Sequence, residues 1–264
     1  MIRKSLAQTK ASTFCVQLPN PAAQGMPTPV GTGFFVSSDG WFATAAHVVK
    51  DANGNVRNDI YSACLMKEHA PGSVGAMCEG VSLDYVDPQW DIALLKVDFG
   101  KNKDKEWLKG KSSFPFIEVS RRQLEEGESV YSFGYPLSEA RTQQHPGMTV
   151  GEVLLSPRVT SAIVSSTLEK TKMIMSSGDE RIYVLDKALN YGNSGGPIVA
   201  TETGKVYALC SCFQPVMVPQ PHLTGSGGKQ VAIITPSLYG IVLALHNPSI
   251  LKALSDRSIP TTAV

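Results

Sequence analysis

The sequence lacks an apolar run long enough to cross a membrane or to serve as a secretory signal. It also lacks a basic stripe, since 24 Lys and Arg are scattered along the chain and offset by 23 Asp and Glu. Nucleic-acid binding needs such a stripe to hold phosphates. We therefore expect no nucleic-acid partner and no membrane partner and, with Met1 taken as the native start, a cytoplasmic protein.

Cysteine is scarce as well. The five cysteines, Cys15, Cys64, Cys78, Cys210 and Cys212, are an odd number, which a framework of paired disulfides does not predict. No His or Cys pair has the spacing of metal ligands, and Cys210-x-Cys212 is tighter than C-x-x-C. We interpret the cysteines as reduced, mostly buried thiols and expect no metal and no cofactor, with a zinc site as the alternative.

What the sequence does contain is a pattern of many short strands. Apolar or alternating runs, such as residues 33–36, 92–95 and 205–209, are separated by turns rich in Gly, Pro, Asn and Asp. Evenly spaced short strands favour a barrel or sandwich, and 264 residues are enough for a double barrel folded as one unit. Only residues 248–257 have a convincing helical pattern, for which Asn247 can be the cap.

Residues 192–197, Gly-Asn-Ser-Gly-Gly-Pro, place a serine in a turn with glycines on both sides. Without side chains, these glycines let backbone amides approach a developing oxyanion and let a substrate chain approach Ser194. Such a turn alone is weak evidence. It also fits the G-x-S-x-G elbow of the α/β-hydrolases, in which the serine comes first and the acid and the histidine follow.

Two further residues give this serine its context. His47 lies among small residues at the end of an apolar stretch, and Asp91 directly precedes the run 92–95. Singly, His47 is explained by a core position and Asp91 by a turn or cap. In the order His47, Asp91, Ser194, however, they supply the base, the orienting carboxylate and the nucleophile of acyl transfer to a hydroxyl. We predict that these three residues are catalytic, and their order argues against the hydrolase elbow.

These strings together resemble the trypsin-like peptidases, most closely the protease domain of the HtrA (Deg) group. The likeness rests on residues 31–36, 44–47, 91–95 and 185–197. It implies an all-β chymotrypsin/trypsin-like fold of two six-stranded antiparallel β-barrels with a short C-terminal helix. The expected organisation is a single peptidase domain, 1–264, with barrels at about residues 10–115 and 125–246 and the helix at 248–257.

The resemblance implies a serine endopeptidase that acts on protein or peptide substrates through an acyl-enzyme. It also implies an oxyanion hole built from the amides of Gly192 and Ser194, with Asn193 between them. Digestive trypsins have an aspartate in place of Asn193, which pairs with a newly released amino terminus. An amide cannot form that ion pair, so we predict no activation step of this kind. HtrA proteins usually carry a PDZ domain and often an export signal, neither of which is evident here.

The resemblance places the primary specificity pocket around a position six residues before Ser194. The strand 208–213 resembles the wall that pairs with a bound peptide, and it places a hydroxyl near Asp91. An uncharged pocket of this kind favours a small aliphatic residue before the scissile bond over lysine or arginine. The residues expected to form it are Ala188, Ser211, Cys212, Phe213 and Ala232.

Two other functions stay open. The same scaffold without turnover would be a peptide-binding module, and the complete set of three catalytic residues argues against that reading. A cytosolic protease without visible gating would endanger its host. The protein is therefore also a candidate for a regulated effector, held silent by a regulatory protein partner or a larger assembly.

Overall fold

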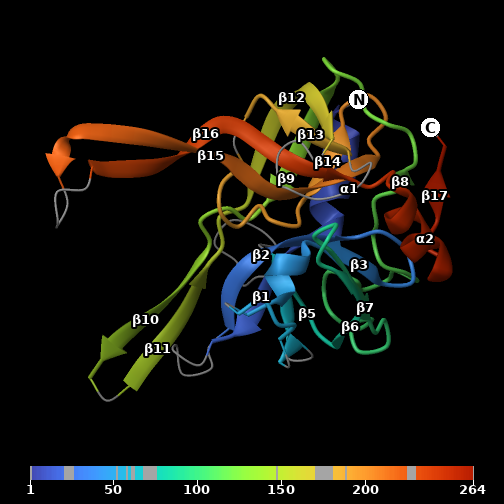
Figure 1. Cartoon of the computed structure of the whole chain (residues 1–264). Coiled ribbons are helices and arrows are strands. Elements are labelled where there is room, and N and C mark those ends of the chain that lie inside the picture. The colour runs from blue at the N-terminus through green and yellow to red at the C-terminus, as the bar shows by residue number, and fades with distance from the viewer. Residues whose placement is uncertain are drawn as a thin grey trace.

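Antiparallel β-structure dominates the computed structural model (Figure 1). A curled seven-stranded sheet forms one half of the molecule, and a closed barrel forms the other. The described residues are 2–20, 27–51, 53–57, 59–60, 63–67, 76–146, 148–169, 181–187, 189–224 and 230–263.

The first sheet has the strand order β5-β4-β1-β2-β3-β7-β6 and curls into a half-barrel. Its core is aromatic, with Phe35 stacked on Phe114 at a centroid distance of 4.6 Å and contacted edge-on by Phe14 at 5.7 Å. The strands are β1 (Thr13–Pro19), β2 (Pro27–Phe35), β3 (Trp41–Thr44), β4 (Cys64–Lys67), β5 (Ala76–Cys78), β6 (Val81–Asp87) and β7 (Ile92–Val97).

The second sheet closes on itself. Strand β14 pairs with β9 on one side and with β15 on the other, so that β14-β9-β12-β13-β16-β15 form a six-stranded barrel. Strands β8 and β17 extend it at the β15 edge. The strands are β8 (Val119–Ser120), β9 (Ser129–Gly134), β12 (Arg158–Glu169), β13 (Arg181–Leu185), β14 (Pro197–Ala200), β15 (Val206–Thr224), β16 (Gln230–Ala244) and β17 (Thr261–Thr262).

The expected all-β, chymotrypsin-like fold is confirmed. The first sheet has seven strands rather than six, because strands as short as β5 do not stand out in a sequence. Two hairpins project from the body on one side (Figure 1). One consists of β10 (Glu139–His145) and β11 (Met148–Leu154), and the other is the outer part of β15 and β16.

Helices are few. The predicted C-terminal helix is α2 (Pro248–Asp256), and the Asn247 side chain caps it by accepting the Ser249 N–H at 2.8 Å. A second helix, α1 (Ile2–Ser12), was not predicted. Its buried positions include Thr9 and Ser12, so the apolar periodicity that marks a helix is weak. No helix in the described part of the chain is long and apolar enough to span a membrane.

The cysteines whose side chains are described match the expected state. Cys15, Cys64 and Cys78 are free thiols, and Cys15, Cys78 and Cys210 are buried. Burial raises the pKa of the Cys64 thiol to about 11, and the nearby Glu79 carboxylate adds to this shift. Burial raises the pKa of Cys15 and Cys78 further, so these three thiols are protonated and unreactive at neutral pH.

Candidate active site

His47 and Asp91 are brought together by two paired strands. Thr44 in β3 lies opposite Ala93 in β7, so the 3₁₀ turn η2 (Ala46–Val49) meets the residue before β7. The backbone N–H of His47 donates to Asp91 Oδ1 at 2.9 Å. Its ring Nδ1 lies 2.8 Å from Asp91 Oδ2 and 3.0 Å from Oδ1. One carboxylate therefore fixes both the backbone and the ring of His47.

Asp91 is itself held from a third direction. The Ser211 hydroxyl donates to Asp91 Oδ2 at 2.7 Å. Burial raises the pKa of Asp91, but hydrogen bonds from His47 and Ser211 and the attraction of a charged His47 outweigh burial and bring the pKa below 3.8. Asp91 has a φ of 45°, a region in which Asp and Asn are enriched among non-glycine residues. The carboxylate is thus ionised at neutral pH and points at His47 Nδ1.

Close packing makes glycine necessary in the turn around Ser194. Gly192 and Gly195 have φ values of +93° and +81°. A Cβ on Gly195 would lie 2.2 Å from Thr44 Oγ1 and 2.3 Å from the Thr32 carbonyl oxygen. A Cβ on Gly192 would lie 2.5 Å from the Tyr135 carbonyl oxygen. The glycines therefore let the nucleophile turn contact both halves of the molecule.

Thr32, a fully buried residue of β2, holds the nucleophile turn through hydrogen bonds to two carbonyl groups of that turn. Its N–H donates to the Ser194 carbonyl at 2.8 Å, and its hydroxyl donates to the Gly192 carbonyl at 2.5 Å. The same hydroxyl accepts the Tyr135 N–H at 3.0 Å. Sequence reasoning used Thr32 only as part of a family likeness. The signal for a role of its own was a threonine between two glycines, Gly31 and Gly33.

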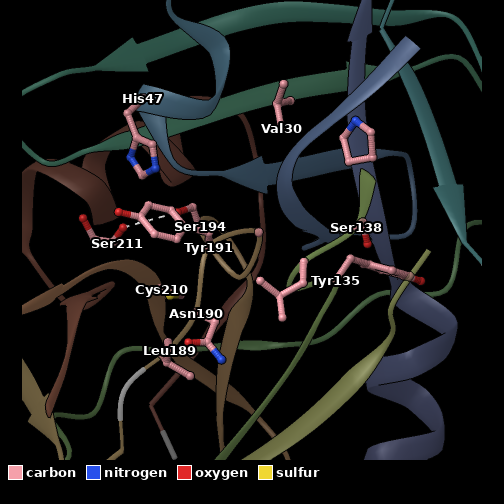
Figure 2. Close-up of a pocket in the computed structure, with 13 residues that line it drawn as sticks. Val30, His47, Tyr135, Ser138, Leu189, Asn190, Tyr191, Ser194, Cys210 and Ser211 are labelled. Atoms are coloured by element: carbon pink, nitrogen blue, oxygen red, sulfur yellow. Dashed lines mark hydrogen bonds between the residues drawn. The ribbon is translucent and has the colours of Figure 1, made fainter. Parts of the chain in front are cut away.

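Two of the three predicted catalytic residues, His47 and Ser194, line one cavity of about 470 Å³, shown in Figure 2. Ser194 Oγ donates to the Ser211 carbonyl at 3.4 Å, and no hydrogen bond to His47 is present among the described residues. At 3.4 Å this contact is longer than an ordinary hydroxyl hydrogen bond. Catalytic hydrogen bonds are often long or absent without substrate.

The backbone amides around the nucleophile differ in whether they have a hydrogen-bond acceptor within the protein. The Asn193 N–H donates to the Asn190 carbonyl at 3.0 Å. The N–H groups of Gly192 and Ser194 donate to no acceptor within the described residues. The amides of Gly192 and of Ser194 itself are therefore able to bind an acceptor from outside the protein.

Comparison with known proteins decides the family. The trypsin-like peptidase domain family matches residues 31–209, which are more than half of the chain. The chain belongs to this family. Serine protease HTRA1A of Danio rerio is 33% identical over 175 residues, covering 66% of this chain and 28% of that protein. Putative protease Do-like 14 of Arabidopsis thaliana is 30% identical over 176 residues, covering 66% of this chain and 33% of that protein.

A longer alignment exists with serine protease HTRA1B of Danio rerio, which is 31% identical over 239 residues. It covers 86% of this chain and 42% of that protein. The chain thus spans less than half of the length of these HtrA relatives. The likeness concerns the peptidase domain and supports a serine protease.

The structure gives the positions of only some of the residues predicted to form the specificity pocket of this trypsin-like domain. Ser211 lies where it was expected, with its hydroxyl on Asp91. Ala188 lies outside the described residues. Cys212 and Phe213 follow Ser211 in β15, where they pair with Ile241 and Gly240 of β16.

The placement of Ala232 was wrong. The strand register sets Ala232 opposite Pro219, six positions beyond Phe213 along β15, which is about 20 Å at the usual rise per residue. It therefore lies in the projecting part of the β15–β16 hairpin. Gly240 lies across from Phe213 instead, because β15 and β16 form a hairpin that extends well beyond Phe213.

The cavity also has walls that the sequence did not predict. Its charged or ionisable lining is limited to His47 and to tyrosine and cysteine side chains, with no Asp, Glu, Lys or Arg among the described lining residues. The lining residues beyond those predicted are Pro29, Val30, Tyr135, Leu137, Ser138, Leu189, Asn190, Tyr191 and Cys210.

Proposed function

We propose that this chain is a serine endopeptidase in which Ser194 is the nucleophile, His47 the general base and Asp91 the residue that orients it. One observation carries the proposal. The Asp91 carboxylate binds the backbone N–H and ring Nδ1 of His47 and the Ser211 hydroxyl, and His47 shares its cavity with the glycine-bounded Ser194. Membership in the trypsin-like peptidase domain family supports this proposal.

The geometry accounts for the proton transfers. An ionised carboxylate at Nδ1 favours the tautomer that has its proton on that atom, so Nε2 is left as the base. Ser194 Oγ exchanges its long hydrogen bond to the Ser211 carbonyl for one to Nε2 as it attacks. The proton then passes from His47 to the leaving amine, and water repeats the sequence on the acyl-enzyme.

The amides of Gly192 and Ser194 supply the oxyanion hole in this proposal. Both lack an acceptor among the described residues, and preorganised amides stabilise the charge that develops on the carbonyl oxygen. Thr32 fixes the turn through the carbonyls of Gly192 and Ser194. This contact supports our proposal that the loop is ordered without an ion pair from a released amino terminus.

A small aliphatic preference before the scissile bond also remains a proposal. Buried Leu189 and the absence of charged side chains in the described lining support it, because a bound lysine or arginine would leave its charge unpaired. We expect alanine or valine to exceed arginine by about a hundredfold in kcat/KM. A peptide-library profile dominated by basic or acidic residues at this position would contradict the pocket assignment.

Hydrolysis by matched serine variants tests the proposed function. Ser194→Ala removes the nucleophile, whereas Ser138→Ala removes a hydroxyl that lines the same cavity and has no role in the mechanism. We expect Ser194→Ala to abolish cleavage of an unfolded protein substrate, and Ser138→Ala to retain it. Thermal unfolding should show that both variants are folded, with Ser138→Ala losing only the hydrogen bond from the Ser156 N–H. Cleavage by Ser194→Ala at a rate close to the wild type would refute the assignment.

A further inference from the structure

The catalytic cavity continues past Ser194 on the side away from Ser211. Figure 2 shows Val30, Tyr135 and Ser138 on that side, while His47 and Ser211 lie on the other. We call this part the apolar arm and define it by Val30, Tyr135 and Leu137, with Tyr191 at its inner end beside Ser194. None of its members carries a charge at neutral pH.

Leu137 is the unusual residue of the apolar arm. Its side chain is 62% exposed and its φ is 58°, so an apolar side chain stands in water on a backbone conformation that leucine rarely adopts. Its N–H donates to the Tyr191 carbonyl at 3.0 Å, which fixes this conformation. Glycine or asparagine at position 137 would adopt this φ with less backbone strain. An exposed apolar side chain on a strained backbone beside a nucleophile indicates that the side chain contacts a ligand.

Tyr191 forms the inner end of the arm, where Figure 2 shows its ring beside Ser194 and Ser211. It is 72% exposed and directly precedes Gly192, whose amide belongs to the proposed oxyanion hole. Leu137 and Tyr191 are both large, apolar and exposed, and a backbone hydrogen bond joins them at the edge of one cavity. Half-buried Val30 from β2 completes the wall. An exposed apolar patch continuous with a reaction cavity is typical of a substrate contact.

The direction of the substrate decides which of its residues reaches this arm. We place the part of the substrate before the scissile bond along β15, the strand expected from the sequence to pair with a bound peptide, with the carbonyl carbon of that bond at Ser194. An extended chain advances about 3.3 Å per residue, so the first residues after the scissile bond are the ones close enough to meet a wall that lines the same cavity as Ser194. We propose that the apolar arm binds a large apolar side chain, such as leucine, methionine or phenylalanine, at one of the first two positions after the scissile bond.

This inference rests on the proposed function, and a peptide library separates the two. Peptides keep one favourable sequence before the scissile bond and vary the two positions after it, and kcat/KM is read for each. For the wild type we expect large apolar residues to exceed aspartate at one position by about tenfold or more. Leu137→Asn, which tolerates the same φ, should reduce this ratio to within about threefold. Tyr191→Arg should instead raise the rate of peptides with aspartate or glutamate there.

Val159→Thr is the matched control, because Val159 is an exposed apolar residue of β12 that does not line the cavity. Its profile should equal that of the wild type. A wild type that cleaves without selectivity after the scissile bond, or a profile that neither Leu137→Asn nor Tyr191→Arg alters, would overturn the inference and leave the proposed function intact. Absence of cleavage of every peptide by the wild type would overturn both.

Discussion

Thr32 joins the first sheet to the nucleophile turn with both its backbone and its side chain. Its N–H binds the Ser194 carbonyl, and its hydroxyl lies between the Gly192 carbonyl and the Tyr135 N–H. Because Gly192 supplies an amide of the proposed oxyanion hole, a change at Thr32 acts on catalysis through the position of that amide. Thr32 is a positioning residue in this account.

Replacing this hydroxyl tests that role. Thr32→Val keeps the shape but leaves the Gly192 carbonyl and the Tyr135 N–H unpaired, at about 1–3 kcal/mol for each group that is buried. We expect kcat to fall by about tenfold or more with a small change in KM, and Thr32→Ser to restore most of it. Steady-state kinetics and thermal unfolding of both variants provide the measurement. Equal kcat values for Thr32→Val and the wild type would contradict the role.

The residues of the site differ in how far the sequence could predict them. Glycine-flanked Ser194, and His47 and Asp91 in the same order as in a known family, are recognisable from local strings. Contacts between distant segments are not, and Thr32 reaches Gly192 across 160 positions of the chain. Leu137 was missed for a related reason, since its positive φ comes from a hydrogen bond to Tyr191.

At the scale of elements, the C-terminal end of α1 is held by a lysine of β4. Lys67 Nζ donates to the Ala11 carbonyl at 2.8 Å and lies 4.7 Å from the Phe14 ring centroid. Carbonyls at the end of a helix lack partners within it, so this bond completes α1. Burial lowers the pKa of Lys67 from 10.5 to about 8, and the charge of Lys111 adds to the shift.

The lowered pKa of Lys67 makes the free energy of unfolding depend on pH in a definite direction. The folded pKa lies below the unfolded one, so between about pH 8 and 10.5 the unfolded chain binds more protons and the contribution of Lys67 to folding improves as the pH rises. We expect the free energy of unfolding of the wild type, relative to Lys67→Met, to increase by up to about 3 kcal/mol over this range. Denaturant titrations at several pH values measure it. Parallel pH curves for the two proteins would contradict this account of Lys67.

Some elements could be predicted from the sequence pattern and others could not. Short apolar strands and the capped α2 were predicted because their signals are local. Helix α1 was missed because it docks with polar groups, among them Thr9, whose hydroxyl lies 3.0 Å from the Tyr131 hydroxyl. Ala232 was misplaced because strand register depends on the length of the β15–β16 hairpin, which no local pattern specifies.

At the scale of the whole molecule, the site uses both halves. His47 and Asp91 come from the first sheet, whereas Ser194 precedes β14 and Ser211 lies in β15 of the closed barrel. The Ser211–Asp91 and Thr32–Ser194 hydrogen bonds cross between the halves. Catalysis in this account therefore depends on how the halves pack. A regulatory protein partner and a cytoplasmic location stay predictions from the sequence.

Covalent labelling of Ser194 by a fluorophosphonate tests the central claim most directly, because it reads out an activated nucleophile without any assumption about the substrate. Intact-mass measurement and peptide mapping locate the adduct. We predict one adduct, on Ser194, in the wild type and in Ser138→Ala, none in Ser194→Ala, and much slower labelling in His47→Ala. A folded wild type that forms no adduct, or forms it on another serine, would contradict the assignment of Ser194 as an activated nucleophile.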